Sequence, residues 1–129
     1  MNTRMELGRA AEEAVAAALV EAGFEIVARN LRVGRLELDV VARRSELVIV
    51  VEVRTRGRGA RTTGFGSLSA VKRDRIRRAA GSLWRRRYAR DPSVSRLRID
   101  AAAVTFDAGE THITYCAGAV VFEPPNRDR

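Results

Sequence analysis

Hydrophobic and polar positions along the first half of the chain predict one helix followed by three strands. Residues 5–22 are rich in Ala, Glu and Leu, which favours a helix, and Gly23 stands where helices commonly end. The segments "FEIVARNLRV" and "RLELDVVAR" alternate with the two-residue period of strands. The residues "RRSE" predict a tight turn into a third strand, "LVIVVEVRT", so we expect an antiparallel hairpin.

The second half of the chain predicts another helix and two further strands. A loop rich in glycine and arginine, "RGRGARTTGFGS", precedes a helix over residues 68–89, which Asp91-Pro92 should end. Strands are expected near residues 96–106 and 111–122. The order α-β-β-β-α-β-β predicts an α/β fold with a mixed central sheet flanked by helices.

Two acidic residues lie on the predicted hairpin, each on the polar side of its strand. Alternation places Leu38 and Val40 on one face of the second strand and Asp39 on the other, with Glu52 and Arg54 on the polar face of the third. Around the turn, Asp39 should lie about opposite position 51, with Glu52 beside it or diagonal. Two carboxylates this close repel each other unless an arginine or a divalent cation lies between them.

A third acid lies on the first helix. Glu12 shares a helical stripe with Val15 and Leu19, which should pack on the sheet. A glutamate on an inward stripe needs a partner, because an unpaired buried charge is costly. Glu12 is therefore a candidate for the same site as the hairpin acids, or else a partner of a nearby arginine.

Lys72, which is the only lysine of the chain, lies near the start of the second helix. If Ser67 or Ser69 caps that helix, Lys72 falls in its first turn, where a cation opposes the helix dipole. It shares a stripe with Ile76, so it can face the sheet. This favours a role at the acidic site, with a snorkelling surface lysine as the alternative.

Composition indicates a small basic domain. The chain has 129 residues, which suits one domain, and we expect it to occupy residues 1–123 with a disordered tail over 124–129. The 24 basic residues outnumber 16 acids, and the net charge of +8 favours a polyanionic partner, nucleic acid before an anionic membrane surface. Simple solubility is the alternative. One cysteine and one histidine exclude a disulfide framework or a Cys/His zinc cluster, and the absence of a long apolar segment predicts a cytoplasmic protein without a membrane span.

The motifs, taken in order, resemble the YraN family of bacterial proteins. They are "GRAAEEAVAAALVEAGFEIVARNLR", "LELDVVA", "VVEVRTR" and "AVKRDRIRRAA". The family belongs to the PD-(D/E)XK nuclease-like superfamily, with a restriction-endonuclease-like fold similar to archaeal Holliday-junction resolvases. The resemblance implies a site of a helical glutamate, Glu12; a strand aspartate, Asp39; and an E-x-K element, which here reads Glu52-Val53-Arg54.

Three departures from the family pattern affect this implied site. The glycine expected before Glu12 is Ala11, and the Gly-Glu-x-Asp element begins with Leu36. The lysine of the E-x-K element is Arg54. Arginine does not deprotonate in proteins, so it cannot act as a base, although it can orient a water or hold a phosphate as a bidentate donor.

The leading hypothesis is a metal-dependent endonuclease that hydrolyses phosphodiester bonds in DNA, with branched DNA included. Asp39, Glu52 and the carbonyl of Val53 would hold Mg²⁺ or Mn²⁺, with Glu12 helping directly or through water. Arg54 would stabilise phosphate charge, and Lys72 would replace the missing lysine. Contacts to the nucleic-acid backbone are expected from arginines of the glycine-rich loop and of the second helix. These are Arg56, Arg58, Arg61, Arg73 and Arg77.

Other readings stay open. The acids can form cross-strand ion pairs with arginine, in which case the chain is a catalytically inactive nucleic-acid-binding module with a nuclease-like fold. A third reading is a scaffold whose basic surface meets an acidic protein. The resolvases that the family resembles act as dimers on a two-fold substrate, so a homodimer is a further alternative.

Overall fold

The computed structural model describes residues 3–56 and 68–125 of the chain. Two helices and a five-stranded sheet form in the predicted order, and the α/β fold with a mixed sheet is confirmed. The elements are α1 (Arg4–Glu21), β1 (Glu25–Val33), β2 (Leu36–Arg44), β3 (Leu47–Arg56), α2 (Ala70–Leu83), a π-helical turn (Trp84–Tyr88), β4 (Arg96–Asp107) and β5 (Glu110–Val120).

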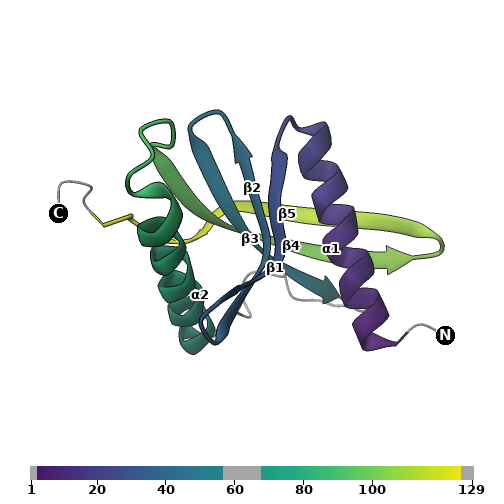
Figure 1. Ribbon diagram of the computed structural model, residues 1–129. Helices are drawn as coiled ribbons and strands as arrows, with labels where there is room; N and C mark the ends of the chain where they lie inside the picture. The colour runs from purple at the N-terminus through teal and green to yellow at the C-terminus, as the bar shows by residue number, and fades with distance from the viewer. Residues whose placement is uncertain (1–2, 57–67, 126–129) are drawn as a thin grey trace.

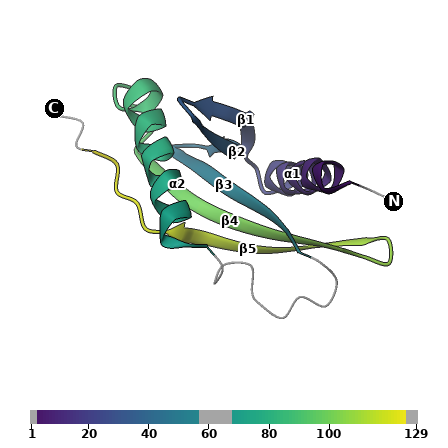
Figure 2. The same ribbon diagram turned by 90° about the horizontal axis from the view of Figure 1, so that it is seen from below.

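The strands lie in sequence order across the sheet, from β1 to β5 (Figure 1). All neighbours are antiparallel except β3 and β4, which run parallel. A parallel pair needs a crossover connection, and α2 lies within that connection. Seen from below, the β4–β5 hairpin extends past α1, away from the rest of the sheet (Figure 2).

Both faces of the sheet are buried, each by one helix. Val48 and Val50 of β3 pack in one apolar cluster with residues of α2. Their neighbours Ile49 and Val51 pack in a second cluster with residues of α1. Consecutive strand residues point to opposite faces, so the unbroken apolar run that opens β3 supplies both cores. This explains why polar residues enter β3 only at its far end.

The predicted face of Val40 is wrong. Leu38 packs in the α2 cluster, whereas Val40 packs in the α1 cluster, so the two residues do not share a face. The pairing of β1 with β2 places Asn30 between the partners of these residues, opposite Asp39, and Asn30 has a φ of 52°. Asparagine tolerates this left-handed conformation. The hairpin is therefore irregular at the level of Asp39, and strict alternation fails there.

The helix ends follow the sequence signals. Thr3 accepts a hydrogen bond from the Glu6 N–H at the start of α1, and Gly23 adopts a φ of 92° just after its end. Ser69 caps α2 by accepting from the Lys72 N–H at 3.1 Å, which selects it over Ser67 as the expected cap. The domain limit predicted at residue 123 stays a prediction, because residues 126–129 lie outside the described residues.

Candidate functional site

The candidate site is a cleft of about 460 Å³ between the β1–β2 turn, the adjoining parts of β2 and β3, and the first turns of α2. Acids from the strands and bases from the turn and the helix line it together, and these charged residues are Arg35, Glu37, Asp39, Glu52, Lys72 and Arg75. Three of the five predicted catalytic residues, Asp39, Glu52 and Lys72, thus meet in one place. Cations from two separate elements surround the acids.

The turn between β2 and β3 brings Asp39 and Glu52 together. Arg44 pairs with Leu47 across the two turn residues, and the ladder runs to Val40, which pairs with Val51. One further step in this register places Asp39 opposite Glu52, whereas the sequence predicted position 51. The prediction was off by one residue, because the two-residue turn, with Ser45 at a φ of 54°, shifts the pairing. The two carboxylates lie close enough for the charge of Glu52 to raise the pKa of Asp39.

Asp39 is bonded to the backbone of β3, and its surroundings disfavour its ionised form. The N–H of Val53 donates to Asp39 Oδ2 at 2.8 Å, which favours the ionised form. Burial, the charge of Glu52 and then the charge of Glu12 act in the opposite direction and raise the pKa of Asp39 from 3.8 to about 7. Asp39 therefore keeps its proton to a higher pH than an exposed aspartate does, unless a cation lies beside it.

Glu52 has a defined cationic partner. Lys72 Nζ lies 2.8 Å from Glu52 Oε1, with the glutamate side chain 11% exposed and the lysine side chain 43% exposed. The Ser69 cap holds Lys72 in the first turn of α2, so its amine projects over the sheet. The ion pair offsets the unfavourable position of a cation at this end of the helix. Lys72 therefore faces Glu52, as its place on the inward stripe allowed, and its catalytic role stays a prediction.

Glu12 acts on the site through its charge. It belongs to α1, whose residues Ala11 and Val15 pack on the opposite face of the sheet from α2, yet its charge raises the pKa of Asp39. Among residues 3–56 and 68–125, no three His, Cys, Asp or Glu side chains form a group that could hold a metal ion. The expected three-acid site is thus a two-acid site with Glu12 nearby, and direct ligation by Glu12 stays a prediction.

The donor set at Asp39 and Glu52 fits a hard divalent cation. Mg²⁺ is commonly bound by one or two carboxylates together with water and substrate phosphate oxygens, so two acids suffice. Burial first, and then the charges of Glu52 and Glu12, raise the pKa of Asp39, and a bound cation would act against this shift. Val53 enters the site through its N–H, and the predicted role of its carbonyl stays a prediction. Arg54 follows two residues after Glu52 on β3 and is half-buried.

The arginines predicted to contact nucleic acid divide into three groups. Arg58 and Arg61 lie outside the described residues, and Arg56 ends β3. Arg73 donates to the Leu68 carbonyl at 2.9 Å. Arg77 donates to the Val121 carbonyl at 2.9 Å and to Asp74 at 3.0 Å, so it also ties α2 to the segment after β5. Their contact with nucleic acid stays a prediction.

We expect Asp39→Asn to stabilise the metal-free protein at about pH 8. A carboxyl whose pKa rises from 3.8 to about 7 on folding costs up to about 4 kcal/mol once it ionises. The stability of the wild type should fall as pH rises through this range. Because the cleft is open to water, we expect a gain of about 1–3 kcal/mol for the variant, measured by urea unfolding with EDTA.

The same comparison at about pH 3 should show a much smaller difference between the two proteins, because Asp39 is then mostly protonated in both the folded and the unfolded state. Glu37→Gln, which also removes an acid from the cleft wall, serves as the control and should show no such pH-dependent gain. Equal stabilities of wild type and Asp39→Asn at about pH 8 would contradict the electrostatic account.

Sequence reasoning missed a second buried carboxylate, Asp100 of β4. It is fully buried, and Arg98 donates to its two oxygens at 2.7 and 2.9 Å. Gly118 N–H donates at 2.9 Å, and the hydroxyl of Tyr115 donates a short hydrogen bond. Burial and the adjacent Asp100 raise the pKa of Tyr115 above its ordinary value. The signal was an aspartate within the apolar run "RIDAAAVTF". With its oxygens occupied in this way, Asp100 serves the fold.

Comparisons with known proteins are consistent in pointing to one family. The model of "Uncharacterised protein family UPF0102" matches residues 11–104. A UPF0102 protein of Sorangium cellulosum is 52% identical over 105 residues, covering 81% of this chain and 73% of that protein. One from Streptomyces griseus is 38% identical, covering 81% and 86%. One from Anaeromyxobacter dehalogenans is 36% identical, covering 90% and 84%.

Among solved structures, SfsA of Pyrococcus furiosus in complex with Ca²⁺ matches with a TM-score of 0.41 and 20% identity. The match covers 90% of this chain and 63% of that one. Separately, no helix in the described part of the chain has the length and apolar character needed to span a membrane.

Proposed function

The chain belongs to the UPF0102 family, and from this premise and the geometry of the cleft we propose that it is a metal-dependent phosphodiesterase that acts on nucleic acid, preferably DNA. The observation that carries the proposal is the neighbouring pair Asp39 and Glu52 in one cleft, with a lysine 2.8 Å from Glu52. Two carboxylates with a lysine and two arginines in one cleft suit the hydrolysis of a phosphodiester. The net charge of +8 supports a polyanionic substrate.

Asp39 and Glu52 would hold Mg²⁺ or Mn²⁺, assisted by the Val53 carbonyl and by Glu12 directly or through water. When bound, such an ion polarises the scissile phosphate and lowers the pKa of an attacking water. The Val53 N–H holds one oxygen of Asp39, Oδ2, and so fixes this carboxylate at the cleft. Loss of the proton from Asp39 makes its carboxylate available as a ligand.

Lys72 supplies the lysine that the strand lacks. Arg54 stands where the family pattern has lysine, and its guanidinium stays protonated, so it can hold a phosphate oxygen but cannot accept a proton. Lys72 reaches Glu52 from α2. As a cation it balances the acids without metal, and it can turn to a phosphate oxygen or to the attacking water once Glu52 takes an ion.

A catalytically silent nucleic-acid-binding module is the second candidate. The observation that favours it is the same ion pair, because Lys72 and Glu52 at 2.8 Å also suit a purely structural contact, and Arg54 removes the usual base. Nucleic-acid binding with a steep salt dependence and no cleavage would decide for this candidate. The homodimer, the cytoplasmic location and the preference for branched DNA stay predictions.

Calorimetric titration of Mn²⁺ tests the proposal directly. At about pH 8, above the raised pKa of Asp39, we expect the wild type to bind a divalent ion and Asp39→Asn to lose that binding. Glu37→Gln, with an exposed acid of the same cleft removed, should bind as the wild type does. A wild type that takes up no ion, or an Asp39→Asn variant that binds equally well, would rule out every hydrolytic form of the proposal.

A further inference from the structure

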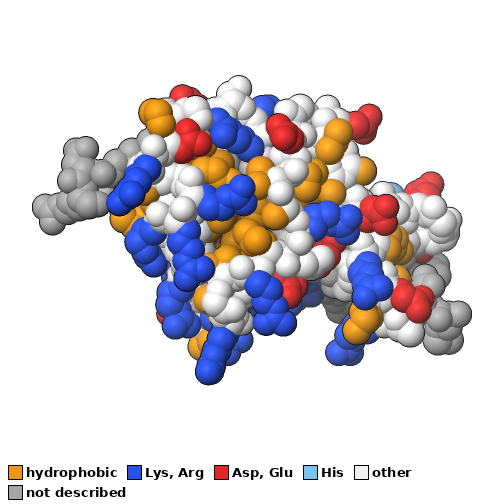
Figure 3. All heavy atoms as spheres, viewed as in Figure 1, with side chains coloured by type: hydrophobic (Ala, Val, Ile, Leu, Met, Phe, Trp, Pro, Cys, Tyr) orange, Lys and Arg blue, Asp and Glu red, His pale blue; other side chains and the backbone are white. Residues whose placement is uncertain are grey.

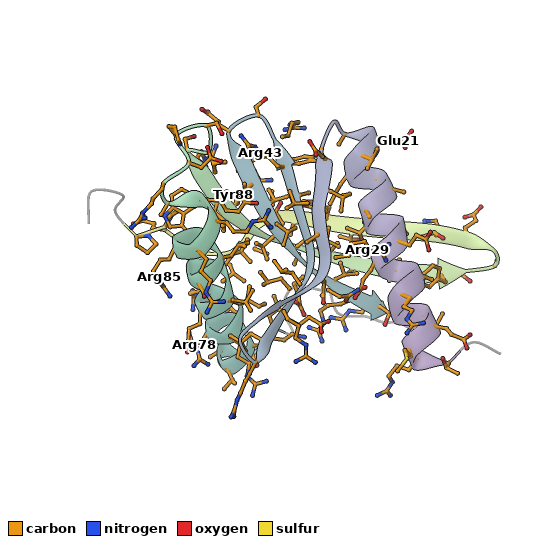
Figure 4. The ribbon with its side chains drawn as sticks, in the orientation of Figure 1. Glu21, Arg29, Arg43, Arg78, Arg85 and Tyr88 are labelled. Carbon is orange, nitrogen blue, oxygen red and sulfur yellow. The ribbon has the colours of Figure 1, made fainter. Side chains whose placement is uncertain are left out.

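The outer surface of α2 and of the π-helical turn that follows it carries a row of arginines that begins at the candidate site. Arg75, Arg78 and Arg85, here called the arginine stripe, follow spacings of three and seven residues and so lie on one side of the helix. All three are exposed, whereas Ile76, on the side of the helix that faces the sheet, is buried. Figure 3 shows Lys and Arg side chains gathered over α2, and Figure 4 shows Arg78 and Arg85 pointing away from the sheet.

The stripe joins two clefts. Arg75 lines the cleft that contains Asp39 and Glu52. Arg78 and Arg85 line a second cleft of about 380 Å³, together with Gly81 and Phe122. A Cβ at Gly81 would lie 3.4 Å from a guanidinium nitrogen of Arg85 and 3.9 Å from the Phe122 ring. The glycine thus lets the guanidinium of Arg85 lie close over the helix backbone beside an aromatic edge.

The charge of the stripe is not compensated by neighbouring acids. Within residues 3–56 and 68–125, no ion pair or hydrogen bond is formed by Arg75, Arg78 or Arg85. Asp74, the one acid on α2, is paired with Arg77 at 3.0 Å. Glu123 also lines the second cleft and lowers its net charge without removing the excess of arginine. Exposed guanidinium groups without partners are suited to bidentate contact with phosphate.

We propose that the arginine stripe binds one phosphodiester backbone that continues out of the candidate site along α2. From Lys72 to Arg85 the helix rises about 20 Å, at about 1.5 Å per residue. This length corresponds to about six base pairs of duplex at about 3.4 Å each. The inference rests on the proposed function for the position of the scissile phosphate, and it specifies the direction in which the substrate leaves the site.

The test measures the binding of a labelled DNA duplex of about 30 base pairs, which is longer than the stripe. Fluorescence anisotropy gives the affinity in the presence of EDTA at several salt concentrations. For Arg78→Ala/Arg85→Ala we expect roughly tenfold weaker binding. The slope of log affinity against log salt should become shallower by about 2, because two phosphate contacts are lost. A matched control, Arg29→Ala/Arg96→Ala, removes the same charge from exposed strand positions and should leave affinity and slope nearly unchanged.

A third variant, Arg78→Lys/Arg85→Lys, keeps the charge and should restore the salt slope with part of the affinity. Equal losses of DNA affinity in the stripe and control variants, or no DNA binding by the wild type, would overturn the proposal that the stripe binds the backbone. Because EDTA removes metal from the assay, the result is independent of hydrolysis. If binding depends on the stripe but the protein cleaves no DNA, the proposed hydrolase is refuted and the proposed stripe is supported. If the protein cleaves DNA and the stripe variants cleave it equally well, the hydrolase is supported and the stripe is refuted.

Discussion

Glu52→Gln is expected to lower Mn²⁺-dependent cleavage of DNA by about 10³-fold. The substitution keeps the shape of the side chain but removes the charge that a divalent ion would require and that now pairs with Lys72. A bound ion stabilises charge in the transition state by several kcal/mol, and a loss of about 4 kcal/mol corresponds to about 10³ in rate. Initial rates on labelled flap and four-way DNA at about pH 8 measure the effect.

Glu37→Gln is the matched control for this experiment. Glu37 lies on β2 in the same cleft wall, is exposed, and has no register position opposite Glu52. Its removal should change the rate by no more than about twofold. Both variants should unfold at nearly the wild-type urea concentration, because Lys72 is 43% exposed and water can replace its partner. Equal rate losses in the two variants would show a general charge effect and refute the role of Glu52.

Asp100→Ala is expected to destabilise the fold by about 3–5 kcal/mol. Asp100 is fully buried and accepts bonds from Arg98, from Tyr115 and from the backbone of Gly118. Alanine would leave a partly buried guanidinium and a backbone N–H without their acceptor, which is the costly way to break a buried ion pair. Equilibrium urea unfolding gives the change in the free energy of unfolding.

Tyr115→Phe measures how much the tyrosine hydroxyl alone contributes to this cluster. It removes one donor while Arg98 keeps both of its bonds to the carboxylate, so we expect a loss of about 1 kcal/mol. Because burial and Asp100 raise the pKa of Tyr115, its hydroxyl stays protonated throughout the neutral range and the loss should not depend on pH there. A loss below about 1 kcal/mol for Asp100→Ala would mean that the cluster is not a structural support.

Local sequence signals were sufficient to predict the elements and part of the site. The composition of α1, its end at Gly23 and the serine cap of α2 depend on contacts within a few residues, so they can be recognised without the fold. The tight turn between β2 and β3 similarly determines that Asp39 and Glu52 meet, with an error of one residue. The position of Lys72 in the first turn and on the inward stripe follows from the same short-range geometry.

Other features depend on contacts between residues distant in sequence. Leu38 and Val40 face different cores because the hairpin is irregular beside Asn30 and both faces are covered by helices. No periodic pattern in the sequence predicts that Arg77 bonds to Val121, 44 residues away. Nor does one predict that Arg78 and Arg85 line a cleft, where their charge is open to a ligand. The four-group cluster at Asp100 likewise needs β4 and β5 together.

The sequence alone therefore determined the order of the elements, the basic character of the protein and the closeness of Asp39 to Glu52, because each follows from composition or from spacing along one or two adjoining segments. Only the tertiary structure decided that Lys72 reaches Glu52 and that Glu12 is separate from the Asp39–Glu52 pair. It also decided which arginines of α2 and of the turn after it have no partner among the described residues. Those properties arise where segments from different parts of the chain pack together, and local patterns carry no information about such packing.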